Sequence, residues 1–233
     1  MHDSTYSKKQ LKTYLEWDWV NWSSAIRYWD KYCSQDYSNS VALEIGARNG
    51  GLSLWLAQKG CQTICSDVNG PTENAKNLHR QFNQSNNIQY TEIDATNIPY
   101  MDYFDIVVFK SVLGGIGRND NFDRQQKTID TIYSSLKSGG ELLFAENLIA
   151  SPIHRFFRKK YVTWAKEWRY VTIKEMERFL NQFRSFNYRV VGFLGAFGRN
   201  ENQKQLFGFL DRNFFQYVSP KSWRYIIVGV ARK

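Results

Sequence analysis

The stretch VALEIGARNGGLSLWLAQKG, residues 41–60, decides the fold class of this chain. Residues 41–46 form an apolar run that ends in Gly46, as a buried parallel strand does, and residues 52–60 then have helical spacing and end at Gly60. Glycines between the two elements allow a sharp turn and the close approach of a ligand to the helix N-terminus. Such a turn alone is weak evidence for a binding site, because ordinary strand-to-helix turns also carry glycine.

The same alternation of strand and helix continues along the chain. Further strands are expected at residues 61–67, 88–93, 104–109, 141–147, 188–195 and 223–231, and helices at 72–84, 121–137 and 172–183. Strands that alternate with helices form a parallel sheet covered on both faces. The Trp- and Tyr-rich residues 8–33 are helix-compatible, with a break near residues 19–24. Residues 198–219 are a polar, Phe-rich segment. We expect one domain, with a helical cap over residues 1–40, a core over 41–147 and a third part over 148–233.

The charge of the chain is unevenly distributed. The 233 residues have a formal net charge of +9, but residues 1–150 hold 14 basic and 17 acidic side chains, whereas residues 151–233 hold 17 basic and 5 acidic ones. An anionic partner is therefore expected to meet the last third. No run of about 18 apolar residues occurs, so no membrane span is predicted. The first residues lack a signal-peptide core, and Cys33, Cys61 and Cys65 have no metal-site spacing, which together predict a cytoplasmic protein with reduced thiols.

Acidic residues follow the second and third predicted strands. Asp67 ends the second strand, about 20 residues beyond the Gly-rich turn, where a carboxylate can accept hydrogen bonds from both hydroxyls of a ribose. Asp94 and Ala95 end the third strand, where an acid can take an adenine amino group and a small residue lets the ring lie flat. The turn lacks the G-x-G-x-x-G spacing of a dinucleotide site and the GK[ST] of a phosphate-binding loop.

These signals resemble the class I S-adenosylmethionine-dependent methyltransferases over residues 40–147. The segment 44–50 is similar to the family's E/D-x-G-x-G-x-G turn, and residues 136–140 are similar to its L-k-p-G-G sequence before the fifth strand. The resemblance implies a Rossmann-like, doubly wound, mostly parallel seven-stranded sheet with a C-terminal antiparallel strand, and S-adenosylmethionine as cofactor with S-adenosylhomocysteine as product. The cofactor-binding residues that it implies are Glu44, Gly46, Ala47, Arg48, Gly50, Asp67, Val68, Asp94, Ala95, Phe109 and Lys110.

The middle glycine of the family's turn is Arg48 in this chain. The Arg48 side chain has three options: to bend outward to solvent, to fold over the methionine carboxylate, or to weaken the cofactor site. The last option keeps open a non-catalytic module on a methyltransferase scaffold.

Three residues are candidates for the chemistry. Lys110 and Glu146 end the fourth and fifth strands, which are expected to be near neighbours, so that one of them can orient the acceptor. Glu146 or His154 can accept its proton. The alternative for Lys110 and Glu146 is an ion pair or a helix-capping contact. The chain has no N-P-P-[YF], D-P-P-[YF] or Pro-Cys after the fourth strand and no metal-ligand set. This argues against methylation of the adenine exocyclic amine or a glutamine amide, against cytosine-C5 methylation and against metal-assisted, catechol-type methylation. His79, on a polar helix, is expected to face solvent.

Residues 151–170 are where substrate-covering elements are expected. Ser151 and Pro152 suit the start of a helix. On a helical wheel one face carries Phe157, Tyr161, Trp164 and Trp168, and the opposite face carries Arg155, Arg158, Lys159, Lys166 and Arg169. Three interpretations stay open: a core-packed helix with a solvated basic face, a surface for an anionic acceptor or a membrane, and a nucleic-acid surface. The segment 154–170 also faintly resembles small methyltransferases of surface-polysaccharide biosynthesis.

The sequence thus predicts a methyltransferase that acts on an oxygen of a small or lipid-linked anionic acceptor, such as a glycan intermediate, with possible peripheral membrane contact through residues 154–170 at the inner surface. The alternatives are an RNA methyltransferase and the non-catalytic module. The aromatic N-terminus is expected either to cap the cofactor crevice or simply to pack on the sheet; its members are Trp17, Trp19, Trp22, Tyr28 and Trp29.

Overall fold

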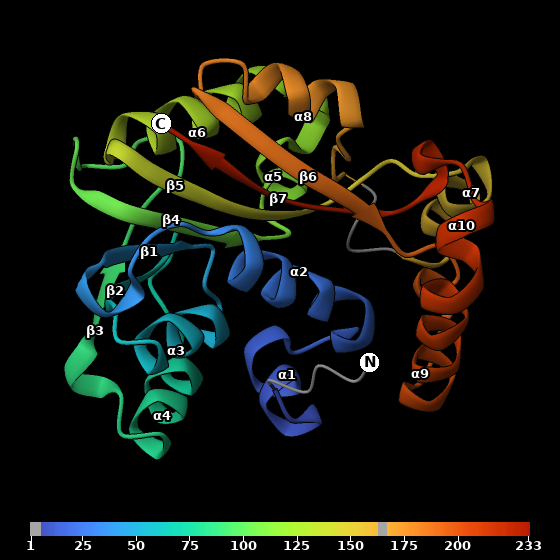
Figure 1. Ribbon diagram of the computed structural model, residues 1–233. Helices are drawn as coiled ribbons and strands as arrows, with labels where there is room; N and C mark the ends of the chain where they lie inside the picture. The colour runs from blue at the N-terminus through green and yellow to red at the C-terminus, as the bar shows by residue number, and fades with distance from the viewer. Residues whose placement is uncertain (1–5, 163–166) are drawn as a thin grey trace.

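The computed structural model describes residues 6–162 and 167–233 and arranges them around one seven-stranded sheet (Figure 1). The strand order is β3-β2-β1-β4-β5-β7-β6, and β7 runs antiparallel to both of its neighbours, whereas the other pairs are parallel. This confirms the predicted Rossmann-like sheet with a C-terminal antiparallel strand. The strands are β1 (Val41–Ile45), β2 (Gln62–Asp67), β3 (Ile88–Glu92), β4 (Phe104–Lys110), β5 (Leu136–Asn147), β6 (Ser185–Val191) and β7 (Ile226–Arg232).

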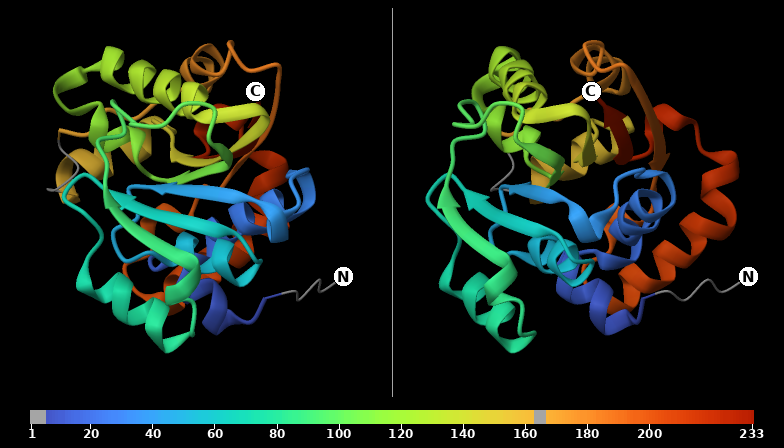
Figure 2. Two further views of the ribbon diagram at one scale, coloured as in Figure 1. Left: turned by 90° about the vertical axis from the view of Figure 1, so that its left-hand side faces the viewer. Right: turned by 60° about the vertical axis from the view of Figure 1, so that its left-hand side comes forward.

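Helices cover both faces of the sheet (Figure 2). Alternate side chains of β4 point to opposite layers: Ile106 and Val108 pack with α1, α2 and α3, whereas Val107 and Phe109 pack with α5, α6 and α8. The helices are α1 (Lys8–Leu15), α2 (Trp19–Tyr32), α3 (Gly51–Gln58), α4 (Glu73–Gln81), α5 (Leu113–Ile116), α6 (Phe122–Ser135), α7 (Pro152–Tyr161), α8 (Ile173–Phe179), α9 (Glu201–Leu210) and α10 (Gln216–Val218), with a π-helical turn η6 (Asp211–Phe215) and the 3₁₀ turns η1 (Tyr37–Asn39), η2 (Ser85–Asn87), η3 (Arg118–Asp120), η5 (Gly195–Phe197) and η7 (Lys221–Trp223).

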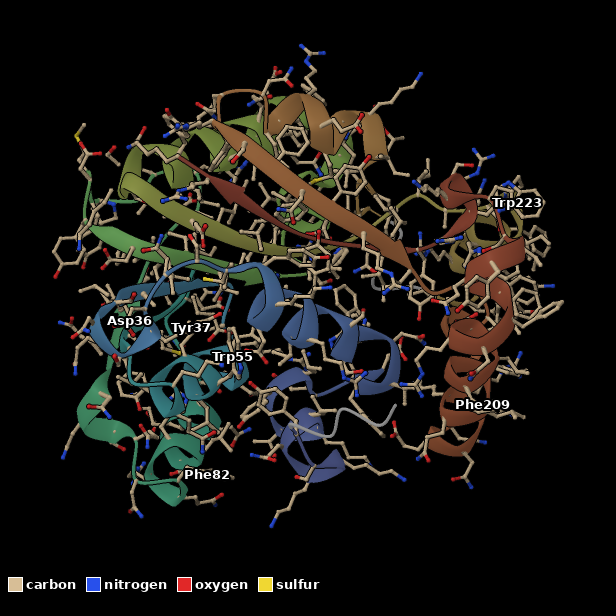
Figure 3. All side chains as sticks on the ribbon, in the orientation of Figure 1. Asp36, Tyr37, Trp55, Phe82, Phe209 and Trp223 are labelled. Atoms are coloured by element: carbon tan, nitrogen blue, oxygen red, sulfur yellow. The ribbon has the colours of Figure 1, made fainter. Side chains whose placement is uncertain are left out.

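The N-terminal helices α1 and α2 are pinned to the sheet by buried tryptophans. The indole of Trp29 donates a hydrogen bond of 3.1 Å to the carbonyl of Gly229 in β7, and its ring lies 5.7 Å from that of Trp55 in α3. Trp55 in turn meets Tyr37, and Figure 3 shows these two side chains together beneath the sheet. The break between α1 and α2 falls at residues 16–18, earlier than predicted, because Glu16 and Asp18 adopt positive φ angles there.

The last third departs from the sequence interpretation at two places. The Phe-rich segment 198–219 is helical, as α9, η6 and α10. Helix α7 ends at Tyr161, so Trp168 is not on it, and Trp164 and Lys166 lie outside the described residues. The core-packed interpretation of this helix is wrong: His154 is its only buried residue, and Phe156 is 61% exposed. Across residues 6–162 and 167–233, no helix has both the length and the apolar character needed to cross a bilayer.

Candidate functional site

A cavity of about 700 Å³ opens at the carboxyl ends of β1, β2 and β4, where an open α/β sheet binds its ligands. The strand ends contribute one wall, and the N-terminal cap contributes the opposite one. The cavity is lined by Tyr14, Glu16, Trp17, Glu44, Gly46, Ala47, Arg48, Gly51, Leu52, Asp67, Lys110, Ser111, Val112, Gly115 and Trp168. The structure therefore brings together six of the residues predicted from the sequence, namely Glu44, Gly46, Ala47, Arg48, Asp67 and Lys110.

The turn between β1 and α3 is held against the end of β2. The backbone N–H of Arg48 donates a 3.0 Å hydrogen bond to Oδ2 of Asp67, and the N–H of Ala47 donates to the carbonyl of Ser66. Gly46 has a φ of +65°, and a Cβ there would lie 2.7 Å from Cγ2 of Val112. Only glycine fits both the conformation and the space at this position.

Arg48 also has a positive φ, of 48°, although it is not glycine. Of the three options for its side chain, the structure has the outward one: the side chain is 70% exposed, and Nη1 lies 3.9 Å from Oε2 of Glu16. This distant, solvent-exposed pair contributes little to stability. The guanidinium therefore stands at the rim of the cavity and does not fill it.

Glu44 lies beneath the first turn of α3. Its Oε2 accepts hydrogen bonds from the N–H of Ser53 at 2.7 Å and from the hydroxyl of the same residue at 2.5 Å. Burial raises the pKa of Glu44 to about 7, against these bonds, which lower it. The carboxylate thus satisfies a helix-terminal amide that would otherwise be unpaired.

Lys110 is held under the N-terminal cap. Its Nζ lies 4.3 Å from the ring centroid of Trp17 and 5.0 Å from that of Trp22, which are cation–π distances. Burial lowers the pKa of Lys110 to about 8, opposed by the negative charges of Glu16 and Glu44. The aromatic N-terminus therefore does more than pack on the sheet, because the cap lines the cavity and its tryptophans cover Lys110.

Glu146 and His154 do not reach the cavity. Oε2 of Glu146 accepts 2.8 Å hydrogen bonds from the N–H groups of Val112 and Leu113, and Oε1 accepts another from Asn147. The helix-capping alternative is therefore the one that the structure has, and burial raises the pKa of Glu146 to about 7. The interpretation of Glu146 as a proton acceptor at the cavity is corrected accordingly.

His154 has both ring nitrogens engaged elsewhere. Its Nδ1 accepts a 2.7 Å bond from the Ser151 hydroxyl, and its Nε2 donates a 2.8 Å bond to the carbonyl of Phe193. Burial lowers the pKa of His154 to about 4. The expectation that it accepts the acceptor's proton is therefore corrected: the ring anchors α7 and has no free nitrogen directed at the cavity.

The remaining predicted residues are spread around the site. The N–H of Ile93 donates to the carbonyl of Asp67, which places Asp94 beside Val68 at the next strand end. Val68 is 54% exposed. Hydrogen bonds from Thr96 lower the pKa of Asp94, and the Ala95 carbonyl accepts a bond from Thr131. Val68, Asp94 and Ala95 are not among the residues that line the cavity.

The packing corrects the expectations for Phe109 and His79. The Phe109 side chain is fully buried in the core layer of α5, α6 and α8, so it does not reach the cavity. Gly50 forms the N-cap of α3 with a φ of +72°, and its carbonyl accepts a 2.8 Å bond from Nε2 of His79. His79 is completely buried and also pairs with the Tyr90 hydroxyl, so it supports this turn and does not face solvent.

Sequence reasoning missed several lining residues. Tyr14 and Glu16 come from the cap, whose pairing with the sheet no local pattern reveals. Trp168 lies against α5, where a Cβ on Gly114 would approach its ring to 2.7 Å. The Gly114-Gly115 pair after β4 was the available signal, because adjacent glycines allow a large ring to pack directly on a backbone.

A second, basic cavity of about 640 Å³ adjoins the first and shares Trp168 with it. Arg158 is fixed in its wall: Nη1 donates 2.7 Å to the carbonyl of Leu148, and the guanidinium stacks 4.1 Å from the Tyr170 ring. Arg155 and Lys159 of α7 also line this cavity, and both are exposed. The lining comprises Asp120, Ile149, Arg155, Arg158, Lys159, Trp168, Arg169, Tyr170, Thr172 and Glu175.

Replacing Glu146 with Gln is expected to destabilise the fold by about 1–3 kcal/mol, because an amide N–H₂ would then face a backbone N–H. The matched control is Glu141→Gln on the same strand, where the carboxylate pairs with the N–H and the hydroxyl of Ser34. An amide can serve both of those groups, so the loss is expected to be smaller. Urea denaturation of both variants measures the difference. Equal stability of Glu146→Gln and the parent would show that the cap has no energetic role.

Comparisons with known proteins agree with this geometry. Residues 43–144 match a family model described as a methyltransferase domain. The sequence matches none of the curated proteins with which it was compared. The structure resembles Haemonchus contortus phosphoethanolamine N-methyltransferase 2 in complex with phosphomonomethylethanolamine and S-adenosylhomocysteine (15% identity, TM-score 0.63, 99% of this chain and 58% of that one).

Two further solved structures cover most of both chains. One is a Thermotoga maritima S-adenosylmethionine-dependent methyltransferase, a possible histamine N-methyltransferase (16% identity, TM-score 0.60, 97% of each chain). The other is the [4+2]-cyclase SpnF (16% identity, TM-score 0.62, 91% of this chain and 80% of that one). At these identities the structures support the fold, and the domain match supports the activity. The domain match over residues 43–144, together with the fold, indicates an S-adenosylmethionine-dependent methyltransferase.

Proposed function

We propose that the 700 Å³ cavity holds S-adenosylmethionine, with its ribose at Asp67 and its methionine end along the turn of Gly46, Ala47 and Arg48. The observation that carries this assignment is the Asp67 carboxylate, which stands at the end of β2 in the cavity wall. One of its oxygens accepts a bond from the turn, and a carboxylate can accept further bonds from ribose hydroxyls. The volume lies within the usual range of small-molecule sites.

The charges of the lining support a cationic ligand. Glu16, Glu44 and Asp67 oppose Arg48 and Lys110 in the wall, and the Arg48 guanidinium is at the rim. An excess of acidic groups favours a sulfonium over a phosphate. We assign the adenine end to the strip beyond Asp67, where Val68 offers an exposed apolar surface beside Asp94 and Ala95.

When bound, S-adenosylmethionine supplies a methyl group attached to a sulfonium, and the neutral thioether formed from that sulfonium is a good leaving group. Methyl transfer then needs an acceptor placed in line and, for a hydroxyl, a group that removes its proton. Of the three candidates from the sequence, Lys110 alone lines the cavity. We assign to Lys110 the orientation of the acceptor hydroxyl. Its neutral amine would accept the hydroxyl proton as the acceptor oxygen took the methyl group, and the electron pair of the broken C–S bond would leave on the neutral thioether of S-adenosylhomocysteine.

The acceptor is proposed to be anionic and to occupy the adjoining basic cavity. Arg158 is fixed in that wall, whereas Arg155 and Lys159 project from α7 and can move to a charged group. Trp168 stands between the two cavities, so an acceptor held by its anionic end can extend its hydroxyl past this ring. The Haemonchus contortus protein, of which the shared fold covers 58%, forms a complex with a phosphate-bearing acceptor, which is consistent with this proposal. A glycan intermediate, free or linked to a lipid at a membrane surface beside residues 154–170, has the required chemistry.

Asp67→Asn is expected to weaken the binding of S-adenosylhomocysteine by about 10- to 100-fold, because hydrogen bonds to a charged group contribute about 1.5–3 kcal/mol. Asparagine retains the acceptor for the Arg48 N–H, so the turn should persist. Asp102→Asn, an exposed acid paired with Lys233, is the control. Isothermal titration calorimetry measures both affinities. Undiminished binding in Asp67→Asn would remove Asp67 from the cofactor site.

The acceptor class is tested by following S-adenosylhomocysteine formation with a panel of hydroxyl acceptors. Phosphate- or carboxylate-bearing sugars, with and without a lipid, are expected to react faster than their neutral counterparts. The double variant Arg155→Gln/Lys159→Gln should raise KM for the anionic acceptors by about tenfold or more. Lys127→Gln/Lys174→Gln, on exposed parts of α6 and α8, is the control for net charge. Turnover with RNA alone would instead establish the nucleic-acid alternative.

The pH dependence of turnover tests Lys110. The neutral amine is the active form, so the rate should rise with pH and level off above the pKa of about 8. Lys110→Arg keeps a cation under Trp17 and Trp22 but cannot deprotonate, so turnover is expected to fall about 100-fold or more and the rising limb to vanish. Affinity for S-adenosylhomocysteine should change little. An unchanged pH profile in Lys110→Arg would exclude Lys110 as the proton acceptor.

A further inference from the structure

Large apolar side chains are exposed mainly in the last third of the chain. Of the fifteen that are exposed in the described residues, ten lie between residues 153 and 223. We call these ten residues the C-terminal aromatic face: Ile153, Phe156, Phe157, Tyr161, Leu206, Phe209, Phe214, Tyr217, Val218 and Trp223. Apolar side chains exposed singly are normal on a protein surface, whereas a large contiguous group of them marks an interaction surface.

Helix α7 supplies the first part of this face. Ile153, Phe156, Phe157 and Tyr161 are spaced by three, four and eight residues from the first, which puts them on one side of the helix. They are between 38% and 61% exposed. The helix is anchored along one edge of this side by the buried His154, whose ring packs against Phe197 and Tyr225. The fold therefore holds this amphipathic helix with its apolar side outward.

The helices α9 and α10 supply the second part. Leu206 and Phe209 are one turn apart on α9, and Phe214 and Tyr217 are one turn apart across η6 and α10. Phe209 and Phe214 are five residues apart, and the π-helical turn lies between them. In a π-helix the backbone hydrogen bonds join residues that are five apart. The π turn thus keeps the exposed apolar side chains in one stripe along the helix.

Ring contacts join the two parts. The Phe157 ring lies 5.4 Å from that of Phe197 in η5, and the Arg199 guanidinium, two residues before α9, lies 5.7 Å from the Tyr161 ring. Phe193 stacks against both Phe215 and Trp223. Figures 1 and 3 show α7, α9 and α10 together at one edge of the molecule, with Phe209 and Trp223 on this layer, far from β3.

Basic side chains surround the exposed rings. Lys160 of α7 lies over the Phe156 and Tyr161 rings, Lys221 is exposed beside Trp223, and Arg155 and Lys159 are exposed on the opposite side of α7. Residues 151–233 carry 17 basic and only 5 acidic side chains. Two copies of such a face repel each other, whereas an anionic surface attracts it. Aromatic rings flanked by lysine and arginine suit the headgroup boundary of an acidic bilayer, where rings and aliphatic stems enter the apolar layer and charges meet phosphates.

We propose that the C-terminal aromatic face docks the protein on the surface of an anionic phospholipid bilayer. The contact surface in this proposal comprises α9, η6 and α10 in addition to α7. Only its purpose rests on the proposed function: Arg155 and Lys159 of α7 also line the basic cavity, so docking brings that cavity to the bilayer surface, where a lipid-linked anionic acceptor resides. Docking itself requires neither the cofactor nor the acceptor.

The test is co-sedimentation of the full-length protein with vesicles of phosphatidylcholine alone and of phosphatidylcholine mixed with phosphatidylglycerol, over a series of salt concentrations. Binding is expected only to the mixed vesicles and should weaken as salt increases. Phe209→Ser/Tyr217→Ser should lower the partition coefficient about tenfold or more, since it removes two inserted rings. Met101→Ser/Tyr103→Ser, exposed apolar residues outside the face, should have no effect.

Charge reversal provides an independent variant. Lys160→Glu/Lys221→Glu should reduce binding to the mixed vesicles at least tenfold, whereas Lys127→Glu/Lys174→Glu, with the same change of net charge, should bind nearly as the parent does. All of these residues are exposed, and circular dichroism and S-adenosylhomocysteine affinity verify the fold of each variant.

Three results would overturn the proposal: no vesicle binding by the parent, equal loss in the matched control variants, or a dimer by light scattering that Phe209→Ser/Tyr217→Ser dissociates. RNA binding that depends on the face and excludes vesicles would also overturn it. The Asp67→Asn variant separates the two hypotheses, because it should lose cofactor affinity and still sediment with mixed vesicles. Failure of docking with normal methyl transfer to a soluble anionic acceptor would leave the proposed function intact.

Discussion

Two buried carboxylates support the crevice on which the site depends. Glu44 accepts the N–H of Ser53 in the first turn of α3, and Glu146 accepts those of Val112 and Leu113 at the start of α5. Burial raises both pKa values to about 7, so each carboxylate needs these donors to remain charged at neutral pH. Because the protein itself occupies these helix-terminal amides, they are not free to bind a phosphate. The groups that line the crevice are instead Asp67, the turn after β1 and the N-terminal cap.

Features that depend on local pattern could be predicted from the sequence. Apolar runs predicted the strands, and the Gly46 turn with Asp67 after the next strand predicted the main wall of the cavity. The missing parts depend on contacts between distant segments. Glu16 and Tyr14 reach the cavity only because α1 docks on α3, and Trp168 reaches it only because glycines in α5 leave room for its ring. The same limit explains His154, since its partner Phe193 lies 39 residues away in sequence.

Polar residues were the hardest to place. His79 sits on a helix of polar composition, yet it is fully buried, because its two ring nitrogens find the Gly50 carbonyl and the Tyr90 hydroxyl. The opposite holds for two aromatic residues. Phenylalanine is most often buried, yet Phe156 and Phe157 are exposed. Hydrophobic pattern defines which side of an element is apolar, but it does not state what covers that side.

The π-helical turn at Asp211–Phe215 has a consequence for tolerance to changes in length. Deleting one residue there would restore regular α-helical pairing, and the segment that follows would rotate by about 100° about the helix axis. The buried Asp211, which accepts the backbone N–H groups of Phe193, Leu194 and Gly195, fixes the preceding part against the sheet. Such a deletion would therefore turn Tyr217 and Val218 away from Phe209 while leaving the catalytic half untouched. Chain length at this single turn therefore sets the direction of the exposed apolar side chains that follow it, independently of the cavity at the strand ends.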